Sequence, residues 1–529
     1  MSSSSIYKFT ISPRAFPAVI FDMDGVVTKT GKVHAAAWKQ LFDEYLQRRS
    51  ERTGEMFRPF DIDSDYRLFV AERPCYDGVS TFLKARGIEL PWGNASDAAD
   101  AETICGLGNK KRDLFQRHLH AGSVERYEST VALIRKMRER GMRTAIVTAS
   151  KSCVAVLQAA GVLDLFDARV DGSDTERLGL HGKPAPDIFL EAARQLGVEP
   201  ACAAVVEDAI LGVEAANAGR FGTVIAVDRT GHAAELQKAG ANVVVRDMAE
   251  VGMRPEVPNE TDVRELPSAM QCLAEIGAFA AKKKPAVFLD FDGTLTAIVS
   301  RPEDAVISAA MRGAVRALAA RCQVAVISGR DLADVRALVG IDGILYAGSH
   351  GFEIAGAAGQ RLEYEAGKDM APVLDQAQKE VEAVLAGVKG AQVQRKKFSL
   401  ALHYRNVEPQ DQEQVRQAAE HALSLHRGLR MTAGKKVWEI QPDVDWNKGK
   451  ALEWIMTALK LDSCSNLPLF IGDDLTDEDA FQAVWDRGIG IIVRDEARLT
   501  KATYALESTE EVQGFLEGLT GYLSGEVAG

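Results

Sequence analysis

The stretch Phe288–Val299 reads FLDFDGTLTAIV, in which an apolar run leads into two aspartates one residue apart, followed by Gly-Thr. Ile20–Thr28, IFDMDGVVT, has nearly the same pattern earlier in the chain. Short apolar runs of this kind indicate buried β-strands. Because ligands of open α/β sheets bind at the carboxyl ends of the strands, the aspartates are candidate site residues. They are Asp22, Asp24, Asp290 and Asp292.

Apolar runs recur through both halves of the chain and alternate with longer amphipathic segments. This alternation is typical of parallel strands joined by crossover helices, so we expect an α/β fold with two doubly wound, Rossmann-like cores. The pattern weakens between Met248 and Lys284, a stretch that contains three prolines. We therefore predict domains at 1–250 and 285–529, joined by a partly helical linker at 251–284.

Composition excludes several classes of partner. The chain has 529 residues, 46% apolar and 26% charged, which suits two or more soluble domains. Its net charge of -12 leaves no basic surface for a phosphate backbone, so we expect no nucleic-acid partner. The sequence shows neither a signal peptide nor a run of roughly 20 apolar residues that would span a bilayer, so we expect no membrane insertion. Seven scattered cysteines without a C-x-x-C pair favour the cytoplasm. The sequence does not indicate an oligomeric state.

Four landmarks recur in the same order in the two halves. In the first half they are Asp22/Asp24, Thr148, Lys183 and Glu207/Asp208; in the second they are Asp290/Asp292, Ser328, Lys448 and Asp473/Asp474. Lys183 precedes Asp208 by 25 positions (208 minus 183), and Lys448 precedes Asp473 by the same number (473 minus 448). The long insertion, however, changes place. A helical cap at about 33–120 is predicted before Thr148, and an α/β cap at about 352–441 is predicted after Ser328.

The landmark residues could support phosphoryl transfer. Paired carboxylates with a third acid can hold Mg²⁺ through hard oxygen ligands. The first aspartate can attack phosphorus, and the second can donate and accept the leaving-group proton. A hydroxyl and a lysine can then bind the phosphoryl oxygens. An isolated D-x-D-G is most often a turn or a helix cap, but the joint order, strand context and duplication favour the catalytic interpretation.

The landmark set resembles the haloacid dehalogenase superfamily of aspartate-nucleophile phosphotransferases. This resemblance implies that Asp22 and Asp290 are nucleophiles and that Asp24 and Asp292 are acid/base residues. The implied phosphate-binding residues are Thr148, Lys183, Ser328 and Lys448. The implied Mg²⁺ ligands are Asp22, Asp24, Glu207 and Asp208 in the first half and Asp290, Asp292 and Asp473 in the second, with the second aspartate of each pair ligating through its backbone carbonyl.

The second half resembles the trehalose-6-phosphate phosphatases from about Pro285 onward. The resemblance rests on LDFDGTLTAIV, VISGRDLADV, LYAGSHGFEI, KKFSLALHYRNV, KKVWEIQPDVDWNKGKAL and IGDDLTDEDAF. It implies hydrolysis of trehalose 6-phosphate beneath a cap. The implied sugar or phosphate contacts are Arg330, His350, Lys397, His403, Arg405 and Glu439; the alternative is that they are paired surface charges. Gln394 replaces an expected Glu, and Gln441 replaces a common Arg, so the sequence departs from the family pattern at positions implied in sugar recognition.

The first half resembles β-phosphoglucomutase and its relatives across roughly Ala18 to Asp228. FDMDGVVTKT, VHAAAWK, VTASKS, GKPAPDIF and VVEDAILGVEAANAG carry this likeness. It implies a cap-hinge role for His34 and a cap lysine, Lys110 or Lys111, near the site. Lys29 replaces the usual Asp, and Cys75 replaces an Arg that would grip a second phosphate, which weakens the mutase interpretation. Three alternatives stay open for this half: a phosphosugar mutase or phosphatase, a phosphosugar-sensing module, and an assembly module.

Overall fold

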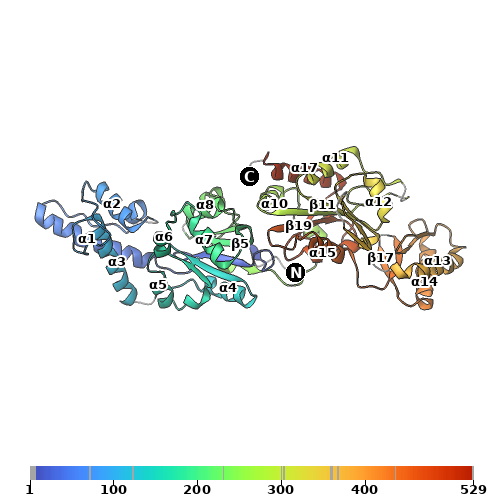
Figure 1. The fold of residues 1–529 in the computed structure, drawn as a ribbon, viewed down its shortest axis with the longest axis horizontal. Helices are drawn as coiled ribbons and strands as arrows, with labels where there is room; N and C mark the ends of the chain where they lie inside the picture. The colour runs from blue at the N-terminus through green and yellow to red at the C-terminus, as the bar shows by residue number, and fades with distance from the viewer. Residues whose placement is uncertain are drawn as a thin grey trace. The chain divides into compact units, whose positions relative to one another are not determined.

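The computed structural model describes residues 7–62, 64–70, 73–121, 124–229, 231–299, 301, 304–357, 362–365, 368–434 and 436–526. The chain divides into two compact units, Met1–Met253 (unit 1) and Arg254–Gly529 (unit 2), coloured blue to green and yellow to red in Figure 1. Each unit is an α/β body built on a largely parallel sheet, which confirms the predicted fold class. The boundary falls inside the predicted linker, 251–284.

The sheet of unit 1 has six strands, and all of its pairings are parallel. In sheet order they are β4 (Ala168–Val170), β3 (Arg143–Val147), β2 (Ala18–Asp22), β5 (Ala203–Glu207), β6 (Thr223–Val227) and β7 (Val243–Val245). Every residue of β2, β5 and β6 is buried, as expected for strands covered on both faces. The crossover helices are α4 (Glu128–Glu139), α5 (Cys153–Ala159), α6 (Gly172–Leu178), α7 (Asp187–Leu196), α8 (Ile210–Ala218) and α9 (Ala233–Lys238).

The first insertion is helical. It contains α1 (Gly31–Thr53), the π-helix Tyr66–Val70, α2 (Cys75–Ala85) and α3 (Ile104–Ala121), and α3 packs against both α1 and α2. Its core is aromatic: Phe42 lies 5.3 Å from Trp38, 5.2 Å from Phe60 and 4.1 Å from Phe82, measured between ring centroids. Outside the cap, β1 (Phe9–Ile11) pairs with β8 (Val251–Met253).

The sheet of unit 2 repeats the order of unit 1 and adds a hairpin at one edge. In sheet order its strands are β14 (Glu363–Glu365), β13 (Glu353–Ala355), β12 (Leu345–Gly348), β11 (Gln323–Ile327), β10 (Lys284–Leu289), β19 (Asn466–Gly472), β20 (Ile489–Val493) and β22 (Tyr504–Leu506). Strands β12 to β22 run parallel, whereas β13 and β14 are antiparallel. The flanking helices are α11 (Ala309–Ala319), α12 (Leu332–Val339), α15 (Lys448–Ala458) and α16 (Glu478–Val484).

The second insertion forms a small α/β layer. Its antiparallel sheet has the order β15 (Gln392–Arg395), β16 (Leu400–His403), β18 (Val437–Pro442) and β17 (Leu429–Gly434), and two helices, α13 (Ala371–Leu385) and α14 (Gln412–Leu425), accompany it. Leu374, Val415 and Ile440 lie in their shared core. The predicted interval 352–441 also includes β13 and β14. These two strands extend the main sheet by pairing next to β12, and Ile354 of β13 packs into the core of the main body.

The residues from Arg254 to Lys283 belong to the body of unit 2. Strand β9 (Thr261–Asp262) pairs with β21 (Leu499–Thr500), and α10 (Leu273–Ala281) packs against α17 (Thr509–Ser524). We call residues 254–283 the strap. Among the described residues, no helix combines the length and the apolar character needed to cross a bilayer.

Candidate active sites

In unit 2, the central strand β10 ends beside a buried lysine. Asp290 follows β10 directly, and the Nζ of Lys448 lies 2.6 Å from its Oδ1. The same Nζ lies 2.6 Å from Oδ1 of Asp477. Lys448 is the first residue of α15, whose N-cap Asn447 accepts a hydrogen bond from the backbone of Lys450. The helix cap therefore fixes the lysine at the carboxyl end of the central strands.

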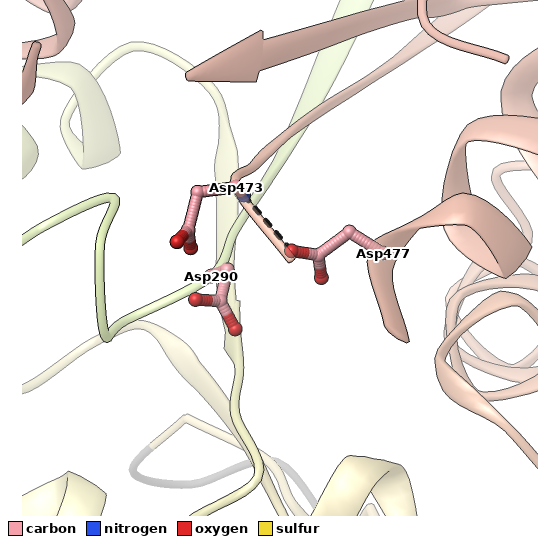
Figure 2. A group of neighbouring side chains, drawn as sticks. All are labelled: Asp290, Asp473 and Asp477. Atoms are coloured by element: carbon pink, nitrogen blue, oxygen red, sulfur yellow. Dashed lines mark hydrogen bonds between the residues drawn. The ribbon is translucent and has the colours of Figure 1, made fainter. Parts of the chain in front are cut away.

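Asp290, Asp473 and Asp477 form an acidic group whose oxygens lie within 4.8 Å of one another, all of them buried (Figure 2). The Oδ2 of Asp477 accepts hydrogen bonds from the backbone N–H groups of Asp473 and Asp474, both at 3.0 Å. Burial raises the pKa of Asp290 well above its usual range, and the other two carboxylates add to this while Lys448 opposes it. A positive charge near Asp290 therefore favours its ionised form.

The close approach of Asp473 requires a glycine. Gly293 has φ +86°, and a Cβ at this position would lie 2.1 Å from Oδ2 of Asp473. Gly25 occupies the same place in unit 1, with φ +85° and a Cβ position 1.8 Å from Oδ2 of Asp208. The glycine of each D-x-D-G motif thus makes room for the aspartate that follows a neighbouring strand.

The second aspartate of unit 2 is held by an arginine. Arg330 donates from Nε to Oδ2 of Asp292 at 2.7 Å and from Nη2 to Oδ1 at 2.8 Å. Its Nη1 lies 3.1 Å from Oδ2 of Asp334. The hydroxyl of Ser328, which is buried, accepts the backbone N–H of Arg330 at 3.1 Å.

A cavity of about 280 Å³ lies between the main sheet and the cap layer of unit 2. Its lining includes residues from the main body, namely Asp290, Asp292, Gly329, Arg330, His350, Lys448 and Asp473. It also includes residues from the cap, namely Gln392, Gln394, Lys396, His403, Arg405, Thr432, Val437 and Glu439. A polar face of the cap sheet thus covers the carboxylates of Asp290 and Asp473.

Glu439 joins the cap to the main body. Its carboxylate accepts from Nε2 of His350 at 2.7 Å, Nζ of Lys396 at 2.8 Å and Oγ of Ser399 at 2.6 Å. Against the effect of burial, Lys396 and His350 hold the pKa of Glu439 well below its usual range. Lys396 also donates to the carbonyl oxygen of Gly329 at 2.8 Å. The residue next to Ser328 is therefore tied directly to the cap.

In unit 1, the corresponding residues also meet. Lys183 donates to Oδ1 of Asp22 at 2.6 Å and to Glu207. Asp24 accepts from Oγ1 of Thr148 at 3.2 Å and from the hydroxyl of Thr30. Burial is the main cause that raises the pKa of Asp22 to about 8 and that of Asp24 to about 6.

Glu207 resembles Asp477 of unit 2 in its contacts. It is fully buried, bonds to the lysine through Oε1 and accepts the backbone N–H groups of Asp208 (2.8 Å) and Ala209 (2.9 Å) through Oε2. Each carboxylate therefore orients the lysine and the acidic turn together.

A buried lysine and a half-buried histidine from the cap of unit 1 form a pair. Nζ of Lys111 lies 2.8 Å from Nδ1 of His34, and the His34 ring stacks on Phe115 at 4.2 Å between centroids. Burial lowers the pKa of His34 well below its usual value and also lowers that of Lys111. Lys110 instead pairs with Glu44 at 2.5 Å. Lys111 is therefore the cap lysine that contacts His34.

The two positions that depart from the β-phosphoglucomutase pattern have different surroundings, and Cys75 lies near enough to Lys111 to interact with it electrostatically. The Sγ of Cys75 donates to the carbonyl oxygen of Gly108 at 3.4 Å. Lys29 pairs with Glu125 at 3.2 Å, and both side chains are exposed.

Both units match the profiles of known protein families. The trehalose-phosphatase family profile matches residues 288–510, and the haloacid dehalogenase-like hydrolase profile matches residues 16–220. A trehalose-phosphate phosphatase from Mycobacterium leprae is 38% identical over 412 residues, which are 75% of this chain and 93% of that protein. The chain belongs to the trehalose-phosphate phosphatase family. A second member, from Mycobacterium tuberculosis, is 42% identical over 337 residues, covering 63% of this chain and 85% of its own.

Another relative matches nearly the whole of this chain but is much longer. A Mycobacterium tuberculosis protein described as an uncharacterized glycosyl hydrolase is 42% identical over 516 residues, or 96% of this chain. The chain spans only 38% of the length of that relative.

Unit 2 brings together most of the site residues predicted for it. His350, His403, Arg405 and Glu439 line the cavity with the catalytic candidates. Lys397 does not: its Nζ contacts Glu353 at 2.5 Å. Ser328 is not part of the lining either, although Gly329 beside it is.

Sequence reasoning missed Lys396 and Asp477. Gln392 and Gln394 alternate along one face of β15 and line the cavity, and Lys396 directly follows that strand. Extending the strand's period of two through QVQRKK would therefore have selected Lys396 over Lys397. Asp477 lies in the acidic turn after β19, where sequence alone does not single it out. The two departures from the family pattern also have defined contacts: Gln394 accepts from Nε2 of His403 at 3.0 Å, and Gln441 is buried beside Arg430.

Proposed function

We propose that unit 2 hydrolyses trehalose 6-phosphate to trehalose and phosphate, as a step of trehalose biosynthesis in the cytoplasm. The observation that carries this proposal is the cavity, in which Asp290, Lys448 and Asp473 lie beneath a cap face of amides, histidine and glutamate. Hydroxyl-rich sugars suit such a face because each of these side chains can exchange hydrogen bonds with hydroxyl groups. The names of the mycobacterial relatives support the choice of sugar.

In the proposed first step, an Oδ atom of Asp290 attacks phosphorus. The bond between phosphorus and the sugar oxygen breaks, and Asp292 donates a proton to that oxygen as trehalose leaves. In the second step, Asp292 takes a proton from water, whose oxygen attacks the aspartyl phosphate. The bond between phosphorus and Asp290 then breaks, which releases phosphate and restores the carboxylate. Lys448, 2.6 Å from Asp290, holds the nucleophile and offsets its charge.

The residues present fit a divalent cation. Asp290 and Asp473 offer hard carboxylate oxygens, the ligands that Mg²⁺ prefers, in a buried acidic group. We assign Mg²⁺ to Asp290, Asp473 and the backbone carbonyl of Asp292. Asp477 is already bonded to Lys448 and to the turn after β19. When bound, the cation would offset the negative charge of the carboxylates and the phosphoryl group.

The decisive experiment compares Asp290→Asn with Asp22→Asn, the same change in the two units. Phosphate release from trehalose 6-phosphate, measured with Mg²⁺, should be abolished by Asp290→Asn and nearly unchanged by Asp22→Asn. Loss of activity on Asp22→Asn alone would assign the reaction to the other unit.

For unit 1 we propose a phosphosugar mutase or phosphatase activity. The mutual contacts of Asp22, Asp24, Thr148 and Lys183 support catalysis. The Mg²⁺ ligands assigned here are Asp22, Asp208 and the backbone carbonyl of Asp24, with Glu207 serving mainly to orient Lys183. Cys75 stands where the β-phosphoglucomutase pattern has an arginine that would grip a second phosphate, and this favours a phosphatase over a mutase.

The alternatives for unit 1 are a non-catalytic phosphosugar sensor and an assembly module. Conversion of β-glucose 1-phosphate with a bisphosphate activator would establish the mutase. A ligand-induced rise in the unfolding temperature without turnover would favour the sensor. Loss of phosphatase activity or assembly on removing residues 1–250, without any ligand effect, would favour the assembly module.

A further inference from the structure

Arg330 is committed to carboxylates on all three of its guanidinium nitrogens. Nε and Nη2 bond to Asp292, and Nη1 bonds to Asp334. The residue is only 9% exposed, and its guanidinium lies 5.3 Å from the centroid of the Phe291 ring. A bidentate pair of this kind fixes both oxygens of a carboxylate in one plane.

The backbone of Arg330 is fixed as well. Its N–H donates to Oγ of Ser328 at 3.1 Å, and its carbonyl oxygen accepts from the N–H of Ser349 at 2.6 Å. Ser349 and His350 have φ values of +50° and +56°, in the left-handed region that side chains rarely adopt. Hydrogen bonds therefore fix both the backbone and the guanidinium of Arg330.

Unit 1 provides an internal comparison. Its Ser150 stands two residues after Thr148, as Arg330 stands two residues after Ser328, and its N–H likewise donates to the preceding hydroxyl at 3.1 Å. The turn is thus the same, but Ser150 cannot reach the second aspartate as an arginine does. There, the hydroxyls of Thr148 and Thr30 hold Asp24. The two copies of one core orient the second aspartate with different chemistry.

We propose that Arg330 is a positioning residue, which orients the Asp292 carboxylate for proton transfer in the phosphatase site and does not contact the sugar. The proposal rests on the function proposed above for unit 2. The ion pairs of Arg330 leave its guanidinium little capacity to bind a hydroxyl group. Sugar recognition therefore falls to the cap face with Gln392, Gln394 and His403.

The test replaces Arg330 by Met, which keeps much of the side chain's length and apolar stem, and by Lys, which keeps the charge. Because the side chains of Asp292 and Asp334 are 40% and 50% exposed, water can hydrate them after the change, so the fold should survive. Arg312→Met is the matched control. Arg312 is also part-buried, and it donates to the carbonyl oxygens of Val339 and Leu338, away from the cavity.

Three measurements separate positioning from sugar binding. For trehalose 6-phosphate, Arg330→Met should lower kcat roughly 100-fold with KM within about twofold, and Arg330→Lys should recover part of the loss. Inhibition by trehalose should be unchanged. With 4-nitrophenyl phosphate and enzyme in excess, release of nitrophenolate should stay near the wild-type rate because this leaving group needs no proton, while multiple turnover falls.

A rise in KM and weaker trehalose inhibition at unchanged kcat would overturn the proposal and make Arg330 a sugar contact. Unchanged kcat for both variants would also overturn it. Slow single-turnover release of nitrophenolate would show instead that Arg330 binds the phosphoryl group. If the wild type hydrolysed 4-nitrophenyl phosphate but not trehalose 6-phosphate, the substrate assignment would fail, while the multiple-turnover comparison would still decide the role of Arg330.

Discussion

At the scale of single residues, Lys396 and Lys397 are adjacent in sequence but differ in environment. Lys396 lines the cavity and joins Glu439 to Gly329, whereas Lys397 pairs with Glu353 and has a side chain that is 46% exposed. Lys396→Met should lower kcat/KM for trehalose 6-phosphate by about tenfold or more, because it removes one of three donors from buried Glu439. Lys397→Met should change it less than about twofold, as expected for an exposed ion pair.

Steady-state kinetics on the two variants measure this difference, and thermal unfolding checks that both fold. Equal losses would contradict the contacts described above. A larger loss for Lys397 would restore the residue chosen from sequence.

That Asp290, Asp292, Lys448 and Asp473 meet in one cavity could be predicted from sequence because each follows a recognisable apolar run or has a fixed spacing. Asp290, Asp292 and Asp473 follow buried strands, and Lys448 lies 25 positions before Asp473. Lys396 could not be selected in this way. Lys396 directly follows β15, so its role depends on which face of that strand meets the cavity, and a shift of one residue in strand register exchanges the two faces.

At the scale of elements, the turn after β10 depends on Gly293. Gly293→Ala would put a Cβ 2.1 Å from Oδ2 of Asp473 and would also strain a residue with φ +86°. We expect loss of phosphate release by about 100-fold or more and loss of any Mg²⁺-dependent rise in the unfolding temperature.

Gly343→Ala is the matched control for this change. Gly343 has φ +88°, but nothing lies within 4 Å of its Cβ position. It should cost about 1 kcal/mol of stability from backbone strain alone, with activity kept. If the two variants behaved alike in activity assays and calorimetry, the approach of Asp473 would not be what the glycine serves.

The two parallel α/β cores were predictable from local pattern, but the packing of the strap was not. Its strand β9 has only two residues, and its prolines suggest a linker. The packing that fixes it is non-local: Arg494 donates to the carbonyl oxygens of Val263 and Leu266, and Val263 donates to that of Arg498. Partners more than 200 positions away leave no periodic signal in the strap itself.

At the scale of the whole molecule, the strap decides where unit 2 begins. Val263, Leu266 and Ile276 are 2%, 8% and 2% exposed, and burying such side chains contributes about 1.5–3 kcal/mol each. A fragment from Arg254 to Gly529 should therefore unfold cooperatively and hydrolyse trehalose 6-phosphate. A fragment from Pro285 to Gly529 should lose much of a typical stability of roughly 5–15 kcal/mol.

Urea unfolding of both fragments, followed by circular dichroism, measures this difference. The larger fragment controls for the loss of unit 1. Similar midpoints for the two fragments would mean that residues 254–284 act as a linker, as their sequence suggests.

The two insertion points have a practical meaning for engineering. In both units the cap leaves and rejoins the core between strands, so the order of the six shared parallel strands is the same beneath a helical lid and an α/β lid. The shared core therefore accommodates an inserted cap at two different positions between its strands. Each insertion point lies between strands, so a lid of a different fold could be exchanged at that point without altering the pairing of the six shared parallel strands.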